Sequence, residues 1–249
     1  MHRFFISPQN IHGSKATIDP DQSRHIEKVL RLGVGSRVTA FDGQGNEYEL
    51  YLLEKQKDFF IGKIEAMVQK DNEPSLKLCL IQGIAKGDKM DTIIQKAVEI
   101  GVSQIYPLES QHGVVRLDEK KAHKKVERWQ TIATEACKQC CRNLVPVVHH
   151  PLAFADLLAL VQNKPTIILY ENEKHTSIRE IITKNRSIIE QNHVYLIIGP
   201  EGGFSDNEVI MLVENGAFAA SLGPRILRTE TAGLVGASIL LYEMGDMET

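Results

Sequence analysis

Two glycine-rich stretches in the C-terminal part of the chain have residue types suited to holding a ligand. In the first, the apolar run Leu196–Ile198 meets Gly199-Pro200 and then Glu201, Gly202 and Gly203. In the second, Gly223-Pro224 again directly follows an apolar segment. Glycine lets a backbone approach a ligand closely and proline fixes φ, so the pair favours rigid loops whose backbone groups recognise a flat group such as a purine. An ordinary tight turn is the alternative for either loop alone.

The first loop argues against a phosphate ligand. A phosphate beside Glu201 would be repelled, and the loop has neither the lysine of a P-loop nor a G-x-G-x-x-G pattern. Ser205 and Glu208 have the spacing of a capping box, which satisfies the helix amides that a phosphate would otherwise use. We therefore expect a neutral or cationic ligand, with Glu201 either in its pocket or bracing the loop through backbone hydrogen bonds.

The segments that must position these loops alternate between strand and helix. Such alternation predicts a parallel sheet with helices on both faces, whose strands end at one ligand-binding edge. The closing helix contains small residues, which indicates close packing against it. The expected strands are 76–84, 103–110, 166–170, 193–199 and 218–223. The expected helices are 87–102, 117–141, 205–216 and one from about 229. The small residues of the closing helix are Ala232, Gly233, Gly236 and Ala237.

The first 70 residues instead predict a small β-barrel. They contain short β-rich segments, the turn signal "DGQGN", and one helix expected over 21–31 with Asp21 as its cap. The polar stretch 69–75, which contains Pro74, is a plausible linker. We therefore expect two domains, 1–72 and 73–249, in an α/β protein.

Composition narrows the class of protein. No apolar run approaches the roughly 20 residues that span a bilayer, which favours a cytoplasmic protein with no membrane partner. Three of the four cysteines crowd into one expected helix and no second pair completes a zinc site, so we expect no metal. The net charge is −3, but basic residues gather in 1–40 and 116–142. These regions are either RNA contacts or solvated surface.

The two loop sequences, "LIIGPEGGFSDNE" and "LGPRILRTETA", resemble the signature segments of the RsmE family, the bacterial small-subunit ribosomal RNA uracil-N3 methyltransferases of the SPOUT class. The resemblance extends over nearly the whole chain and includes "HRFF", "HIEKVLR", "KGDKMDTIIQKAVEIGV" and "ERWQTIATEACKQCCRNLVP". One departure is Gln111-His112, where the family usually has Glu-Arg, so an arginine contact to RNA or across a dimer is absent or replaced.

The resemblance implies a PUA-like barrel followed by a SPOUT domain with a trefoil knot. It also implies a homodimer with its active site at the subunit interface, which we expect to bury the small-residue face of the closing helix. The implied cofactor is S-adenosylmethionine, a sulfonium cation without phosphate. Its implied binding residues are Leu169, Ile198, Gly199, Pro200, Glu201, Gly202, Gly203, Leu222, Gly223, Ile226 and Leu227.

The implied reaction is methylation of uracil N3 in 16S ribosomal RNA of the small subunit. It requires loss of the imide proton, for which Arg228 is a candidate stabiliser and Glu230 a candidate base or orienting group. A structural ion pair or packing is their alternative role. Candidate RNA contacts are Arg3, Arg31, Lys86 and Arg142. Rival functions are a SPOUT enzyme with another target, such as a ribose 2′-hydroxyl or a guanine nitrogen, a nucleotide-binding enzyme of small metabolites, and a non-catalytic ribosome-assembly factor.

Overall fold

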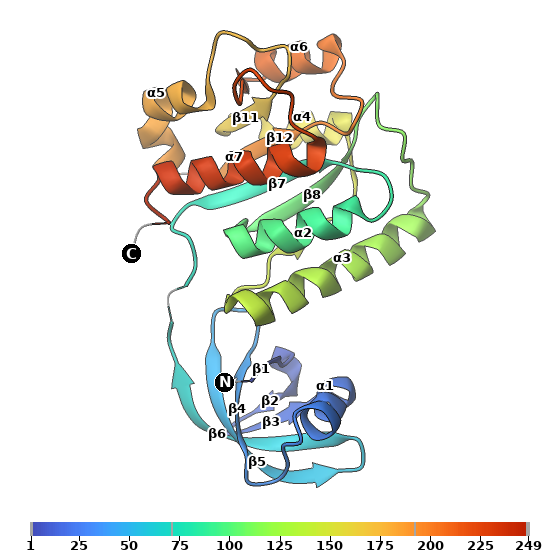
Figure 1. The fold of residues 1–249 in the computed structure, drawn as a ribbon, viewed down its shortest axis with the longest axis vertical. Helices are drawn as coiled ribbons and strands as arrows, with labels where there is room; N and C mark the ends of the chain where they lie inside the picture. Colours follow the sequence, from blue (N-terminus) through green and yellow to red (C-terminus); the bar gives the residue numbers. More distant parts are fainter. Residues whose placement is uncertain (1, 71, 192, 248–249) are drawn as a thin grey trace. The chain divides into compact units, whose positions relative to one another are not determined.

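The computed structural model describes residues 2–70, 72–191 and 193–247, and the chain divides into two compact units (Figure 1). The first unit contains the chain up to Glu73 together with Cys137–Val145. The second contains Pro74–Ala136 and the chain from Pro146 onward. No change of composition marks the segment Cys137–Val145. It joins the first unit because Arg3 donates hydrogen bonds to the carbonyl oxygens of Cys137 and Arg142, at 2.6 and 2.7 Å.

The second unit is built on a seven-stranded sheet whose pairings are all parallel. Its strand order is β10-β8-β7-β12-β11-β13, with β9 paired to β8. The central strands are short and almost entirely buried, and aliphatic residues predominate in them, as expected for strands covered on both faces. The strands are β7 (Lys77–Gly83), β8 (Gln104–Glu109), β9 (Val147–Val148), β10 (Leu152–Ala153), β11 (Thr166–Leu169), β12 (His193–Ile198) and β13 (Phe218–Ala220).

Helices cover both faces of this sheet, which confirms the α/β prediction. On one face, Ile81, Ile168 and Ile197 pack in one cluster with apolar residues of α4 and α6. On the other face, α7 lies along β7 and β12 and also contacts α2 (Figure 1). The helices are α2 (Lys89–Ile100), α3 (Glu119–Cys140), α4 (Phe154–Val161), α5 (Ile178–Glu190), α6 (Asp206–Glu214) and α7 (Thr229–Glu243).

The small residues of α7 pack against the sheet of the same chain. A Cβ atom at Gly236 would lie 2.8 Å from Leu169 Cδ1 and 3.1 Å from Leu196 Cδ2, and one at Gly233 would lie 3.0 Å from Gln82 Oε1. Glycine is therefore needed here for helix–sheet contact. The expectation that this face is buried by a second subunit is wrong, because the chain's own strands already cover it.

The first unit is a six-stranded sheet in the order β1-β4-β5-β6-β3-β2, in which β1 pairs parallel to β4 and the other pairings are antiparallel. Its core contains alternate residues of the long strands, among them Leu50, Leu52 and Phe60. The strands are β1 (Arg3–Phe5), β2 (Ile11–His12), β3 (Lys15–Ile18), β4 (Arg37–Phe41), β5 (Glu47–Gln56) and β6 (Phe59–Val68).

The helix of the first unit begins earlier than expected and changes type along its length. Helix α1 (Pro20–Arg24) begins after Asp19, not at Asp21, because Pro20 is well suited to the first helical position. It continues as a π-helix, η2 (His25–Val29), and Arg31 follows with a φ of 56°. Ile26 is buried whereas Val29 is exposed, although three positions apart they would share one face of a regular α-helix, so the wider π-helical turn separates them.

None of the helices in the described part of the chain is both long and apolar enough to cross a membrane.

Candidate active site

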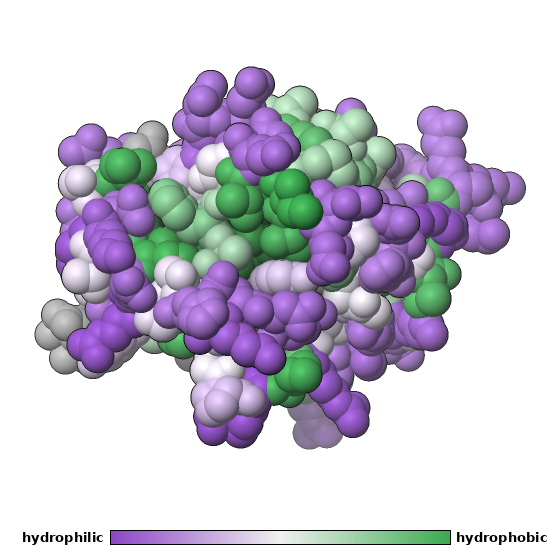
Figure 2. Space-filling view, turned by 90° about the horizontal axis from the view of Figure 1, so that it is seen from above, coloured by the Kyte–Doolittle hydropathy of each residue, from purple (hydrophilic) through white to green (hydrophobic). Residues whose placement is uncertain are grey.

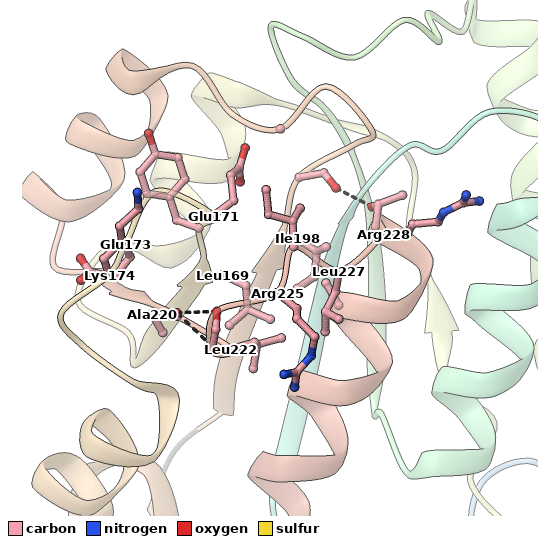
Figure 3. A pocket seen from close by; sticks show the side chains of 18 of the residues that line it. Leu169, Glu171, Glu173, Lys174, Ile198, Ala220, Leu222, Arg225, Leu227 and Arg228 are labelled. Atoms are coloured by element: carbon pink, nitrogen blue, oxygen red, sulfur yellow. Dashed lines mark hydrogen bonds between the residues drawn. The ribbon is translucent and has the colours of Figure 1, made fainter.

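A cavity of about 930 Å³ opens at the carboxyl ends of β11, β12 and β13 (Figure 3). These three strands are neighbours in the sheet, and each is followed by a loop that lines the cavity. The loops run over 170–177, 199–203 and 221–228. The carboxyl edge of a parallel sheet is where such folds bind ligands, because loops from adjacent strands converge there.

The floor of the cavity is apolar. Leu169, Ile198, Leu222 and Leu227 gather around it in Figure 3, and seen from above, apolar groups surround a hollow bordered by hydrophilic ones (Figure 2). Ile226 also lines it, although 82% of this residue is exposed in the free chain. A large exposed apolar side chain beside a cavity favours a ligand that covers it. The floor therefore suits a flat, largely apolar group.

The loop after β12 can form only with glycine at its critical positions. Gly203 has a φ of +67°, and the carboxylate of Glu171 occupies the space that its side chain would need. A Cβ atom at Gly199 would lie 3.2 Å from the backbone of Gly203. The loop thus folds back on itself and presents backbone to the cavity.

A buried chain of hydrogen bonds joins the two ligand loops to the centre of the sheet. Gln82, the penultimate residue of β7, donates from Nε2 to Thr229 Oγ1 at 2.8 Å. Thr229, the first residue of α7, in turn donates to the carbonyl oxygen of Gly199 at 2.5 Å. Beside these hydrogen bonds, a Cβ atom at Gly83 would overlap the backbone nitrogen of Pro200, so β7 and the first loop are in backbone contact. These contacts fix the start of α7 beside the first loop.

Glu201 braces its loop and orders a lysine. Its Oε1 accepts from the backbone N–H of Lys86 at 3.1 Å and from Lys89 Nζ at 3.2 Å. Lys89 Nζ also lies 3.3 Å from Oε2 of Glu230. Lys89 therefore connects the loop after β12 to the first turn of α7, and it lines the cavity. Of the two roles open for Glu201, the bracing role is the one that these bonds support.

These contacts keep all three groups charged. Burial raises the pKa of Glu201, but hydrogen bonds from its own backbone N–H, from Lys86 and from Lys89 outweigh burial and leave that pKa below its ordinary value. The hydrogen bond from its own backbone N–H, then Lys89 and Arg228, lower the pKa of Glu230. The hydrogen bond to Glu201, and then the contact with Glu230, raise the pKa of Lys89. The cluster is thus a cation held between two carboxylates.

The cavity brings together the residues that the resemblance implied for the cofactor, with the exception of Gly202. Gly202 faces the loop after β8, where a Cβ atom would meet His112 O at 3.0 Å. That loop is also held by Glu208, whose Oε1 accepts from Gln111 N at 2.7 Å and whose Oε2 accepts from Ser205 N at 2.9 Å. Gln111-His112 thus packs on the outer side of the first ligand loop, and the capping box predicted for α6 is confirmed.

Sequence reasoning missed the third loop, 170–177, and the part played by Lys89. Tyr170 donates to Asp206 Oδ1 at 2.6 Å, and Glu173 Oε1 accepts from the backbone of His175 and Thr176 at 2.7 and 2.9 Å. These bonds tie the loop to α6 and shape it around the cavity. Its position at the end of an expected strand was the available signal.

The predicted RNA contacts fall into two groups. Arg31 and Lys86 are exposed. Arg3 and Arg142 have side chains only 7% and 6% exposed, and they pair with Glu47 and Glu73 within the first unit. Their burial favours a structural role over RNA contact, because a paired guanidinium inside the fold is not available to phosphate. The sequence pattern could not separate the two groups, since all four are basic residues in basic segments.

Comparison with known proteins identifies relatives along the whole chain. A family model described as RNA methyltransferase domain matches residues 72–241, and one described as RNA methyltransferase PUA domain matches residues 18–65. The chain is 34% identical to ribosomal RNA small subunit methyltransferase E of Bacillus subtilis (strain 168), over 98% of this chain and 97% of the relative. It is 31% identical to the protein of the same name from Buchnera aphidicola subsp. Acyrthosiphon pisum, over 92% and 88%.

A solved structure agrees with these relatives. It is the crystal structure of a ribosomal RNA small subunit methyltransferase E from Neisseria gonorrhoeae bound to S-adenosyl methionine. It superposes with a TM-score of 0.84 and 33% identity, and 98% of each chain is covered. The parallel-sheet unit and the N-terminal sheet described above are therefore the fold of that enzyme.

Removing the hydroxyl of Thr229 should weaken the second unit. We expect Thr229→Val to lower the free energy of unfolding by about 1–3 kcal/mol, because the buried Gly199 carbonyl and Gln82 amide lose their partner. Urea unfolding followed by fluorescence of Trp129, the single tryptophan, measures it. Thr131→Val at an exposed position of α3 is the control, with a change within about 0.5 kcal/mol. Equal stabilities of the two variants would contradict the role of this hydrogen-bond chain.

Proposed function

The chain belongs to the RNA methyltransferase family of the ribosomal RNA small subunit methyltransferases E, and from this membership we propose that it methylates N3 of a uracil in 16S ribosomal RNA, with S-adenosylmethionine as methyl donor. The observation that carries the proposal is the cavity at the carboxyl edge of the sheet, in which both Gly-Pro loops meet. The RNA named here comes from the names of the relatives, and the uracil N3 target from the family resemblance.

The chemistry of the cavity suits the proposed cofactor. The apolar floor and the backbone of Gly199 and Gly203 fit a flat adenine, and the carboxylates of Glu171 and Glu173 on the wall fit the positive sulfonium and ammonium groups of the cofactor. The capping box already uses amides of the first loop's helix, which argues against a phosphate. When bound, S-adenosylmethionine supplies a methyl group activated by its sulfonium charge. The protein must then position the target base and favour loss of its N3 proton.

We assign different roles to Arg228 and Glu230. Arg228 is exposed and extends away from the apolar floor in Figure 3, so we propose that it meets the RNA at the mouth of the cavity. Glu230 is 24% exposed on its side chain and faces Lys89. Because its pKa is lowered, Glu230 is ionised at neutral pH, and we propose that it orients Lys89.

Local backbone geometry supports Arg31 as an RNA contact. A non-glycine residue with positive φ is uncommon, and π-helical turns occur often at functional sites. Arg31 follows such a turn with a φ of 56° and is exposed. With a net charge of −3, affinity for RNA must come from local basic sites of this kind. We propose Arg31 and Lys86 as two such sites, and the cytoplasm, where ribosomal subunits form, as the place of the reaction.

Methyl transfer to defined substrates tests the proposal. We expect tritiated methyl transfer to small subunits from a strain lacking the enzyme, far less to uridine monophosphate, and N3-methyluridine as the product found by mass spectrometry of digested RNA. Arg31→Glu should reduce transfer at least tenfold without changing cofactor affinity, with Lys63→Glu in the same unit as control. A methylated ribose or guanine would instead establish the rival target class, and no transfer in any substrate would refute the proposal.

Truncating an exposed wall residue tests the cofactor site without disturbing the fold. Ile226 is 82% exposed, so Ile226→Ala should leave stability unchanged. If the cofactor covers this side chain, the loss of buried methyl and methylene groups should weaken binding by about 1.4 kcal/mol, or tenfold. Calorimetry with S-adenosylmethionine measures it, and Ile210→Ala on the exposed face of α6 is the control. Unchanged affinity in Ile226→Ala would place the cofactor elsewhere.

We also propose the homodimer and the trefoil knot that the family resemblance implies. The knot is supported by the return of α7 to β7 and β12 after β13 at the sheet edge, and by the contact of Gly83 with Pro200. For the dimer, sedimentation velocity at micromolar concentration should give twice the chain mass of 27.9 kDa. A species of single-chain mass at that concentration would refute the dimer.

A further inference from the structure

Lys89 occupies a position that a lysine would ordinarily avoid. It is the first residue of α2, where the helix dipole is positive, and a cation there is unfavourable by roughly 0.3–1 kcal/mol. Two carboxylates from distant parts of the chain, Glu201 and Glu230, offset this cost. The side chain is still 35% exposed and lines the cavity. A simple surface ion pair would need only one carboxylate and no unfavourable helix position, so this arrangement indicates that the position of Lys89 matters for the site.

The ammonium group retains hydrogen-bonding capacity toward the cavity. A lysine has three N–H donors and no acceptor. One donates to Glu201 Oε1 at 3.2 Å, and the contact with Glu230 Oε2 at 3.3 Å is an ion pair without hydrogen-bond geometry. In the described part of the chain no further partner is seen for Nζ. At least one donor is therefore left for a ligand.

We propose that Lys89 is a catalytic residue that donates a hydrogen bond to a carbonyl oxygen of the target uracil and stabilises the imide anion formed when N3 loses its proton. The inference rests on the proposed function and assigns the charge stabilisation to a residue of the segment "KGDKMDTIIQKAVEIGV" to which neither the loop motifs nor the family resemblance gave a role. In this step the N3–H bond breaks, its electron pair stays on the imide, and the proton leaves to water or hydroxide. The negative charge spreads onto the two carbonyl oxygens beside N3, so a fixed ammonium at either oxygen favours the anion.

Lys89 is better placed for this task than Arg228. Stabilisation of developing charge is most effective when the donor is already fixed, since no energy is then spent on reorganisation. Lys89 is held from two sides, whereas in the described structure no hydrogen bond or ion pair fixes the exposed guanidinium of Arg228. Two charged groups contact Lys89, namely Glu201 from the loop after β12 and Glu230 from the start of α7. Arg228 acts on Glu230, and Lys86 donates its backbone N–H to Glu201. On either side of Lys89 in the sequence, Asp88 and Asp91 pair with Arg128 of α3.

The pH dependence distinguishes this role from a structural one. A cation at the uracil lowers the pKa of the bound imide below that of the free base. At a pH between these two pKa values, the uracil is therefore mostly an anion when bound in the site and mostly neutral when free. We expect kcat for methylation of small subunits to rise with pH and then level off. Lys89→Met should move the rise to higher pH and lower kcat at neutral pH about 10²–10³-fold, the usual effect of losing one such donor.

Four further measurements complete the test. Calorimetry should show that Lys89→Met binds the cofactor with an affinity within twofold of that of the wild type. The control variant Lys96→Met changes a lysine of the same helix that pairs with Glu99, and it should have wild-type kcat at every pH. Small subunits with 5-fluorouracil, whose imide is more acidic, should recover part of the activity that Lys89→Met loses. Without cofactor, affinity for unmodified small subunits should increase with pH in the wild type and not in Lys89→Met.

The outcomes separate this inference from the proposed function. A wild-type enzyme inactive on small subunits would refute the function itself. An active wild type whose pH profile is unchanged in Lys89→Met, or a loss explained entirely by weaker cofactor binding, would overturn the role of Lys89. If fluorescence of Trp129 shows that Lys89→Met does not fold, the test uses Lys89→Gln, which retains a hydrogen-bond donor for Glu201 without the charge. The same shift of the rise in kcat to higher pH is then expected for Lys89→Gln.

Discussion

The buried hydrogen-bond chain from Gln82 through Thr229 to Gly199 is the constraint on which the rest of the site depends. It joins the end of a central strand, the start of the last helix and the first ligand loop, which are far apart in the sequence. A hydrogen bond in a buried site is costly to leave unmade, so these three elements hold one arrangement. The close contact of Gly83 with Pro200 and of α7 with the sheet reinforces it. The cavity is the space that this arrangement leaves at the sheet edge.

The same geometry explains why a carboxylate, Glu201, lies within the glycine-rich loop. A carboxylate inside a glycine-rich ligand loop is unexpected if the loop binds phosphate, but here it holds Lys86 and Lys89. The loop therefore does two things at once. Its glycines present backbone to the cavity, and its carboxylate fixes a cation at the cavity wall. The proposed reaction needs both functions in one place. The electrophilic methyl group of the sulfonium cofactor and the target uracil, which must become an anion, have to meet there.

Much of the fold was predictable because its signals are local. Buried aliphatic runs predicted β7, β11 and β12, the apolar spacing from Ala122 to Cys140 predicted α3, and Ser205-x-x-Glu208 predicted the start of α6. Helices α4 and α5 were not predicted, and neither was the burial of Arg3 and Arg142. The burial of each arginine depends on a carboxylate far away in the sequence, 44 positions for Arg3 and Glu47 and 69 positions for Arg142 and Glu73, and the composition of the basic segments does not reveal these partners. Likewise, glycines in α7 showed that something packs closely, but not that it is the chain's own sheet.

The three loops after β11, β12 and β13 lie on one fixed frame, and we propose that together they form one cofactor site. Hydrogen–deuterium exchange with and without S-adenosylmethionine tests this most directly, because every loop is monitored in the same experiment. We expect slower exchange on addition of the cofactor in all three loops, 170–177, 199–203 and 221–228, and unchanged exchange in the core of α3. Protection of only one loop, or protection centred on the first unit, would contradict the account.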